Sequence, residues 1–294
     1  MVIDFKGAHY PKAVIVHAVF FYVRYAVSYR DLEEILAERG VSVDHATLNR
    51  WVVKYSPLIA ANAQTRKKPS DNSWRMDETY IKVKGKWTYY YRAIDKFGKT
   101  LDFMLSEHRD EAAATAFFTR AIGNNGFPDR VVIDKSGANL AGLQNMNCLL
   151  ILNGWFWLIE VLQVKYLNNI IEQDHRFIKK LTRQMKGFKS FKSASATLEG
   201  IEVAHMIRKQ QFETSGQSAF KRFAALAGEL CLAKSMNPPS AKICDRTPQG
   251  VSPLFCYVAV VAVGFAFWES NHFSIWEHSV FRVAVGLRRF ENVR

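Results

Sequence analysis

The sequence has few cysteines, and none of them is grouped with another cysteine or with histidine. The four, Cys148, Cys231, Cys244 and Cys256, are scattered, and no Cys-x-x-Cys pair occurs. A structural zinc site needs closely spaced Cys and His ligands, and a disulfide framework is typical of short secreted chains. We therefore expect neither feature in this chain of 294 residues.

The beginning of the chain also lacks the features of a signal peptide. The first ten residues, MVIDFKGAHY, carry an acid early and no adjoining apolar segment with a cleavage site. We expect a protein of the reducing cytoplasm.

One uncharged run, over residues 251–268, reaches the length of a membrane span. Four residues interrupt its apolar character: Ser252, Pro253, Tyr257 and Gly264. A membrane span is therefore the less favoured interpretation, and we expect no membrane association. We interpret residues 236–294 as an atypical C-terminal extension.

Negative charge is scarce relative to positive charge. The chain has 40 Lys and Arg residues against 27 Asp and Glu residues, which gives a formal net charge of +13. Such an excess favours an anionic partner, and nucleic acid is the usual one.

The first 60 residues have the pattern of three short helices. Ser28 is placed to cap the second of them, and Gly40 follows its end. Asp44 is placed to cap the third. The expected helices cover residues 12–27, 29–38 and 45–55.

Two helices joined by a short turn with a glycine match the helix-turn-helix plan. The second helix of the pair would present four polar residues to a DNA major groove: His45, Thr47, Asn49 and Arg50. A plain three-helix bundle without a DNA role is the alternative. The helical pattern weakens after Tyr55, so we expect a DNA-binding domain at residues 1–60 and a linker at residues 61–72.

Residues 73–192 predict a mixed α/β domain. Two β-rich runs flank Lys84-Gly85 as a hairpin, and a third strand is expected over residues 100–105. A helix over residues 111–122, ended by Gly123, precedes a short apolar strand. This strand covers residues 130–133. The elements expected after it are a helix at 138–152, a basic helix from 168 and a helical part at 193–235.

Three acidic residues stand at distinctive points in this order. Asp77 lies inside the first strand, where Asp is disfavoured. Asp134 ends the short apolar strand, at the strand end where open α/β sheets bind ligands. Glu172 lies near the start of the basic helix. The ordinary alternatives are a surface-facing Asp77, a helix-capping Asp134 and a Glu172 paired with Arg176.

The expected order of elements, which is three strands, a helix, a strand and a helix, matches the ribonuclease H-like plan. Three carboxylates that converge in it can hold two magnesium ions, with manganese as a substitute, for in-line displacement at phosphorus. We interpret Asp95 as a turn residue and Asp174 as a helix-surface charge. Asn168 and Asn169 would orient Glu172, contact DNA or cap the helix. The basic residues expected to contact phosphates are Lys165, Arg176, Lys179 and Lys180.

Ordered matches along residues 5–235 give a more specific resemblance. They are Phe5-Lys6-Gly7, Ser28-Tyr29-Arg30, Ala37-Glu38-Arg39-Gly40-Val41, Asp44-His45, Arg50-Trp51-Val52, Met76-Asp77-Glu78-Thr79-Tyr80, Tyr91-Arg92-Ala93-Ile94-Asp95, Lys165-Tyr166, Asn168-Asn169, Ile171-Glu172-Gln173-Asp174-His175, and Lys189 to Arg208 with Gly200-Ile201-Glu202. On these residues the chain resembles DDE transposases of bacterial insertion sequences, closely those typified by insertion sequence twenty-six.

The resemblance implies that Asp77, Asp134 and Glu172 form the catalytic triad. It also implies that the N-terminal helices read terminal inverted repeats in double-stranded DNA, and that a homo-oligomer cleaves 3′ ends and joins them to target DNA. A nucleoid-associated location in a bacterial cytoplasm follows. The alternatives are a DNA-binding regulator, a nuclease that cleaves without joining, and a transposase disabled by its tail.

The spacing of the second and third acids departs from the family pattern. Between Asp134 and Glu172 lie 37 residues (172 − 134 − 1 = 37), more than the family usually has. We place the extra length in a surface helix and loop over residues 140–160.

Overall fold

The computed structural model describes residues 3–152, 154, 158–185, 187–213 and 217–228. The chain divides into two compact units, Met1–Pro238 and Pro239–Arg294, and only the first contains described residues. The expected extension at 236–294, with its uncharged run, therefore lies outside the described residues. Within the described part, no helix combines the length and the apolar character that crossing a membrane requires.

Three helices begin the described chain: α1 (Lys12–Arg24), α2 (Tyr29–Ala37) and α3 (His45–Arg66). The Ser28 hydroxyl accepts a hydrogen bond from the Asp31 N–H while the Asp31 carboxylate accepts one from the Ser28 N–H, a reciprocal cap of α2. The Asp44 carboxylate accepts a hydrogen bond from the Thr47 N–H at the start of α3. Both predicted N-caps are thus confirmed.

Helix α3 is longer than the sequence predicts, because it continues beyond Tyr55 to Arg66 and includes Pro57. The polar residues of this part obscure an apolar face on which Ile59 and Ala63 are fully buried. The buried Asn62 side chain donates to the Leu226 carbonyl oxygen. Tertiary packing therefore extends the helix into the first part of the expected linker.

Five strands form one sheet in the order β3-β2-β1-β4-β5. The strands β1, β2 and β3 are antiparallel, whereas β4 runs parallel to β1 and β5 parallel to β4. The hairpin turn at Lys84-Gly85 has positive φ at both residues, 50° and 79°. The strands are β1 (Ser73–Val83), β2 (Lys86–Asp95), β3 (Thr100–Ser106), β4 (Arg130–Ile133) and β5 (Glu160–Gln163).

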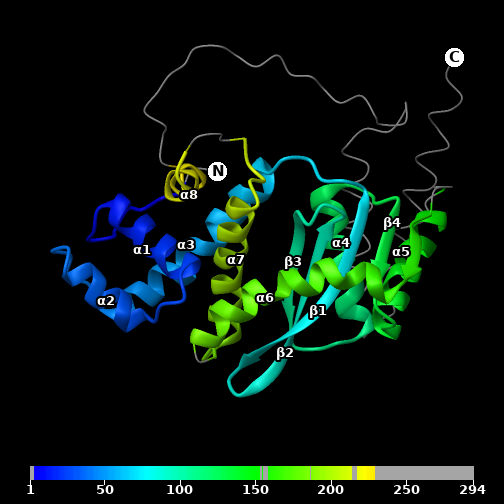
Figure 1. Ribbon diagram of the computed structural model, residues 1–294, viewed down its shortest axis with the longest axis horizontal. Helices are drawn as coiled ribbons and strands as arrows, with labels where there is room; N and C mark the ends of the chain where they lie inside the picture. Colours follow the sequence, from blue (N-terminus) through cyan, green and yellow to red (C-terminus); the bar gives the residue numbers. More distant parts are fainter. Residues whose placement is uncertain (1–2, 153, 155–157, 186, 214–216, 229–294) are drawn as a thin grey trace, which may run out of the picture. The chain divides into compact units, whose positions relative to one another are not determined.

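Helices cover both faces of this sheet (Figure 1). One face packs on α4 (Glu111–Asn125) and α5 (Gly137–Leu152), with Trp74 and Met76 of β1 in the shared core. The other face packs on α6 (Asn169–Gln184) and α7 (Phe191–Arg208). This is the predicted ribonuclease H-like arrangement: a mixed sheet of three antiparallel and two parallel strands between helices.

Other predicted elements also differ in detail from the structure, and α1, expected over residues 12–27, ends at Arg24. Helix α4 runs through Gly123 and ends before Gly126, whose φ of +83° favours glycine. The strand β5 was not predicted, because Val161-Leu162 between the exposed Glu160 and Gln163 is too short to show an alternation.

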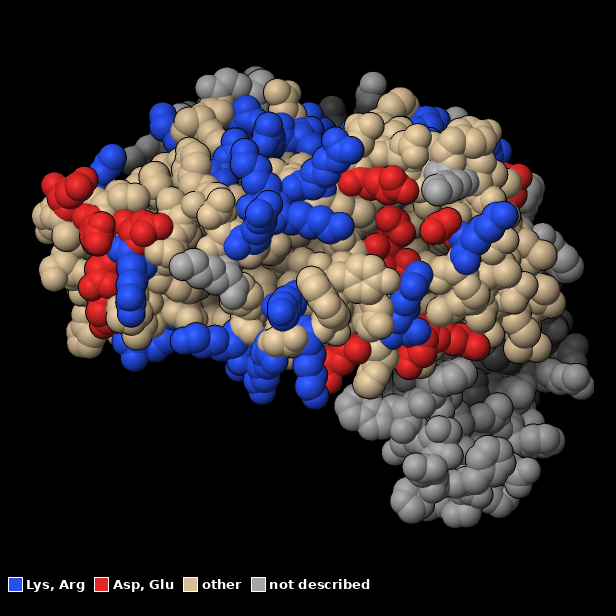
Figure 2. All heavy atoms as spheres, turned by 60° about the horizontal axis from the view of Figure 1, so that its bottom comes forward, with Lys and Arg blue, Asp and Glu red and all other residues tan. Residues whose placement is uncertain are grey.

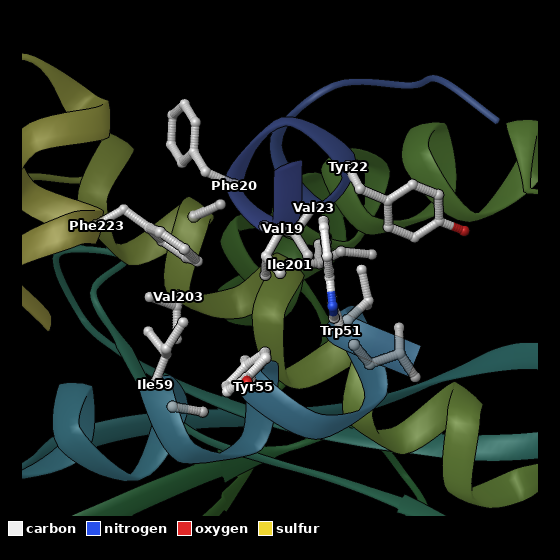
Figure 3. Packing of buried hydrophobic residues seen from close by; sticks show 14 of the residues in the cluster. Val19, Phe20, Tyr22, Val23, Trp51, Tyr55, Ile59, Ile201, Val203 and Phe223 are labelled. Carbon is white, nitrogen blue, oxygen red and sulfur yellow. The ribbon is translucent and has the colours of Figure 1, made fainter. Parts of the chain in front are cut away.

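The N-terminal helices share their hydrophobic core with α7 and α8 (Ala219–Leu226). Figure 3 shows side chains from α1, α3, α7 and α8 pointing toward one another, among them Val19, Tyr55, Ile201 and Phe223. The same buried cluster continues onto the α6 side of the sheet through Ile178. One core therefore holds the N-terminal helices against the α/β part.

Candidate active site

The pairing of β1 with β4 brings the segments that carry two of the predicted acids side by side. Arg75 lies opposite Val132 in this parallel pair, and the ladder ends there. Asp77 follows two residues later on β1, and Asp134 follows two residues after Val132, directly after β4. Residues level with each other in a parallel ladder project from the same face, and neighbouring strands lie about 4.8 Å apart. A ladder continued in this register would bring both carboxylates to one edge of the α6 face.

Helix α6 brings the third acid to this face. Glu172 lies in its first turn and is exposed. One turn later the buried His175 places Nε2 3.3 Å from Oδ2 of Asp77. Residues three apart are neighbours on a helix surface. Glu172 thus occupies the turn next to the one that contacts Asp77.

Two hydrogen bonds hold the start of α6 against β1. The Arg75 Nε donates to the Leu167 carbonyl oxygen at 2.8 Å. The Asn168 Nδ2 lies 3.4 Å from the Met76 carbonyl oxygen, one residue before Asp77. Asn168 stands at the N-cap position of α6, but its side chain makes no capping hydrogen bond. The adjacent Asn169 is exposed.

The three acids offer the ligand chemistry that magnesium prefers, since hard cations take carboxylate oxygens. The Asp77 side chain is 19% exposed, and Asp134 and Glu172 are exposed residues. Within the described ranges, however, no three His, Cys, Asp or Glu side chains are grouped closely enough to hold an ion. The donors fit a divalent cation, and their grouping around one would require a change in side-chain positions.

Asp174 is a centre of buried ion pairs, so its predicted role as a helix-surface charge is wrong. Its side chain is 12% exposed and lies 2.7 Å from each of three donors: Arg92 Nη2, Lys209 Nζ and His205 Nε2. Burial alone would raise the pKa of Asp174, but the His205 hydrogen bond and the two cations hold it well below its ordinary value. The sequence hides this role because α6 meets β2 and α7 only in the fold.

The fully buried Arg92 connects these charges to the acid site. Its Nε and Nη2 donate to the two Glu202 carboxylate oxygens at 2.6 and 3.0 Å, and its Nη1 lies 3.4 Å from His175 Nδ1. A guanidinium group only donates, so Nδ1 accepts and the ring proton lies on Nε2, which is 3.3 Å from Asp77 Oδ2 without forming a hydrogen bond to it. Burial lowers the pKa of His175, which favours this neutral form.

Sequence reasoning did not assign His175, Arg92 or Glu202 to the site. A signal was present, because Arg92 interrupts an apolar strand and Glu202 lies in an apolar helix. Charged residues are rarely buried without a partner. Asp95, in contrast, has the predicted turn role, since its Oδ1 accepts from the N–H groups of Phe97 and Lys99.

The second half of α6 forms a basic surface. From Arg176 to the end of the helix the charged residues are all cationic. Figure 2 shows Lys and Arg side chains gathered over the middle of one face, beside a smaller group of Asp and Glu. A hollow of about 620 Å³ is lined by Arg176, Lys179, Lys180, Arg183 and Gln184. Three of the predicted phosphate contacts thus lie together, and the side chain of the fourth, Lys165, is outside the described residues.

The four predicted base-contacting residues lie at the start of α3. His45 and Arg50 are exposed, and Thr47 and Asn49 are partly exposed. His45 Nδ1 lies 3.2 Å from Oε2 of Glu33 on α2, and Arg50 Nη2 donates to Thr47 Oγ1 at 2.6 Å. The first contact connects α2 with α3 and the second lies within α3, whose first turns stay partly exposed.

Comparison with known proteins gives a consistent family. Residues 71–211 match a family model described as a DDE domain. The transposase for insertion sequence-like element IS431mec of Staphylococcus aureus is 42% identical over 214 residues, which cover 70% of this chain and 89% of that protein. The transposase for insertion sequence element IS257 in transposon Tn4003, also from Staphylococcus aureus, matches with the same identity and coverage.

Among solved structures, the HTLV-2 integrase catalytic core domain in complex with magnesium aligns with a TM-score of 0.31 and 14% identity, covering 59% of this chain and 93% of that one. The identity to the two staphylococcal transposases and the matching DDE domain establish the family. The chain belongs to the DDE transposases of bacterial insertion sequences.

Proposed function

We propose that this transposase cleaves the 3′ ends of its insertion sequence and joins them to target DNA at a site built from Asp77, Asp134 and Glu172. The observation that supports the proposal is the parallel pairing of β1 with β4, which ends two residues before Asp77 and Asp134, beside the helix α6 that carries Glu172 in its first turn.

Magnesium is the proposed cofactor, as two ions with manganese as a substitute, and it would activate the attacking oxygen and stabilise the leaving oxygen. Asp77, Asp134 and Glu172 would hold these ions through their carboxylate oxygens. The described conformation has no ready group of three ligands. Asp134 and Glu172, which are exposed, would have to approach the more buried Asp77 to hold an ion together with it.

The chain's own residues would also hold the DNA. We infer that Arg176, Lys179 and Lys180, together with Lys165, contact phosphates next to the acids. Residues 1–60 would act as a helix-turn-helix domain, in which His45, Thr47, Asn49 and Arg50 read the inverted repeats. Residues 73–192 would be the catalytic core, with residues 193–235 as its helical support.

Two element ends must be handled together for transposition, so a homo-oligomer is the proposed working form. Double-stranded DNA, as inverted repeats and as target, is the proposed partner. The proposed location is the bacterial cytoplasm, in association with the nucleoid.

Incubation of the full chain with labelled inverted-repeat DNA and a plasmid, with and without magnesium, tests the proposal. We expect metal-dependent cleavage at the 3′ end followed by joined products, and neither product from Asp77→Asn. Cleavage without joining would indicate a nuclease. Binding of the repeat without either reaction would indicate a DNA-binding regulator or a disabled transposase.

A further inference from the structure

We propose that a groove beside the β1–β2 hairpin binds an unpaired DNA strand by stacking its bases on exposed aromatic rings. This inference rests on the proposed function, because it assumes that DNA reaches the acid site. It adds a binding site for single-stranded DNA that adjoins the phosphate contacts on α6, with which it shares Lys179, and that is separate from the N-terminal helices.

The groove lies where the hairpin extends past the helices that cover the sheet (Figure 1). It has a volume of about 950 Å³ and is lined by the hairpin and by the second half of α6. Ile81 of this lining follows Asp77 by four residues on β1 and so lies on the same face, whereas Tyr80 projects from the other face. Lys179 follows Glu172 by two turns on α6. The groove is therefore built on the same two elements that carry two of the acids, and it opens along the edge of β1.

Three aromatic rings form one wall of the groove. The Trp87 residue is 63% exposed and Tyr80 is 47% exposed. Trp87 meets Tyr80 edge-on at a centroid distance of 6.4 Å, and Tyr89 lies 5.5 Å from Tyr80. Tyr80 and Tyr89 are also direct partners across the two strands. The rings hold one another in place, so they form a platform before any ligand arrives.

The exposure of this platform points to a ligand. A large aromatic ring on the surface keeps apolar area in water, and clustered exposed rings are typical of binding surfaces. Trp87 contributes to neither hydrophobic core of the described residues. Its position is therefore not explained by the packing of the fold.

The charged residues that line the groove are all positive. The groove is lined by Lys82, Lys179 and Arg183 and by no acidic residue of the described chain. The Lys82 Nζ lies 5.8 Å from the centre of the Trp87 ring. Two copies of the chain that met through this surface would bring like charges together, whereas a phosphate backbone would neutralise them.

Aromatic rings next to cations are the usual combination at sites for single-stranded nucleic acid. Cations alone are sufficient for the phosphates of a duplex, whose bases are stacked on each other. Only an unpaired base offers a free face to Trp87 or Tyr80. A strand separated from its complement beside the acids would supply such bases.

Fluorescence anisotropy of a labelled 20-nucleotide oligothymidine, compared with a duplex of equal length, tests this inference on the full chain. We expect Trp87→Ala to weaken oligothymidine binding roughly 5-fold or more, because stacking on one ring is worth that much per base. Duplex binding should change less than about 2-fold, since phosphates supply it. Trp87→Phe should retain most of the oligothymidine binding.

The matched control is Phe97→Ala, which removes a 70% exposed ring at the β2–β3 turn outside the groove. It should leave both affinities unchanged. Equal losses for oligothymidine and duplex in Trp87→Ala, or no loss for either, would overturn the inference. The inference would also be overturned if sedimentation showed that Trp87→Ala no longer associates with a second copy while its affinity for both DNAs stays unchanged.

The joining assay separates this inference from the proposed function. A protein that joins ends but binds oligothymidine equally well with and without Trp87 would refute the groove and leave the function intact. A protein that never joins ends, yet loses oligothymidine binding selectively in Trp87→Ala, would refute the function and leave the groove.

Discussion

His175 lies between the buried guanidinium of Arg92 and the carboxylate of Asp77, and its two ring nitrogens face these two groups. Because Arg92 can only donate, the ring proton lies on Nε2, 3.3 Å from Asp77 Oδ2, although no hydrogen bond joins the two. We interpret His175 as a positioning residue that would donate to this carboxylate in the working form. Arg92 and His175 connect the charges of Asp174 and Glu202 to the acid site.

Replacement of His175 by alanine should lower end joining about 10- to 100-fold, as is usual when a partner of a metal ligand is lost. It should also raise the magnesium concentration needed for half-maximal joining. His175→Gln, whose amide can donate at a similar reach, should recover part of both losses. Gln173→Ala, an exposed change on the same helix, is the control. Equal defects in the alanine and glutamine variants would contradict the positioning role.

His205 makes the stability of the fold depend on pH. Burial lowers the pKa of His205 below its ordinary value of 6.5, more than the hydrogen bond to Asp174 raises it. The unfolded chain therefore takes up this proton at a higher pH than the folded protein does. The free energy of unfolding should fall as the pH decreases below about 6.5. Urea unfolding at pH 7.5 and 5.5 measures this fall in the free energy of unfolding. An equally large fall in His205→Gln would show that His205 is not its source.

At the scale of elements, the close contact of α4 with α5 depends on one glycine. A Cβ at Gly142 would lie 2.8 Å from the Ala114 Cβ and 3.1 Å from the Thr115 backbone nitrogen. Neither atom belongs to a side chain that can rotate away, so α5 must shift. This contact fixes the helix that begins the long segment between the second and third acids.

Gly142→Ala should therefore lower the free energy of unfolding by about 1–3 kcal/mol, the usual cost of overpacking. Gly123→Ala is the matched control, because this glycine is also helical and a Cβ there meets nothing within 4 Å. It should leave stability unchanged or raise it by up to about 1 kcal/mol. Thermal unfolding of both variants distinguishes them. A neutral Gly142→Ala would show that the two helices separate without cost.

Local signals in the sequence predicted the elements whose ends are determined locally. The caps at Ser28 and Asp44 and the turn at Lys84-Gly85 all involve residues close together in the chain, so their patterns are visible without the fold. The positions of Asp77 and Asp134 were also predictable, because each marks an unusual place on a strand.

The remaining features depend on residues far apart in the sequence. The extension of α3 to Arg66 and the burial of Asp174 both arise from packing against α7 or α8. The contact of His175 with Asp77 likewise requires α6 to lie on β1. Spacing within one segment contains no information about such contacts, so the sequence alone gave the wrong environment for Asp174.

At the scale of the whole molecule, the net charge of +13 predicts strongly salt-dependent DNA binding. Each phosphate contact that is lost should reduce the slope of log K against log salt by about 0.9. Lys179→Gln with Lys180→Gln should therefore reduce it by roughly 2. Lys96→Gln is the control, since Lys96 lies on the β2–β3 turn and pairs with Asp71 at 2.8 Å. Equal slopes for the double variant and the control would exclude α6 from the DNA interface.

The central claim is that Asp77, Asp134 and Glu172 work as one unit. Single-turnover joining of a labelled inverted-repeat end by Asp134→Asn, by Glu172→Gln and by the variant with both changes tests it most directly. Residues that act as a unit are not additive, so each single change should abolish joining as completely as the two together, while binding of the repeat is retained. Wild-type joining by either single variant, or losses that multiply in the double variant, would contradict the claim.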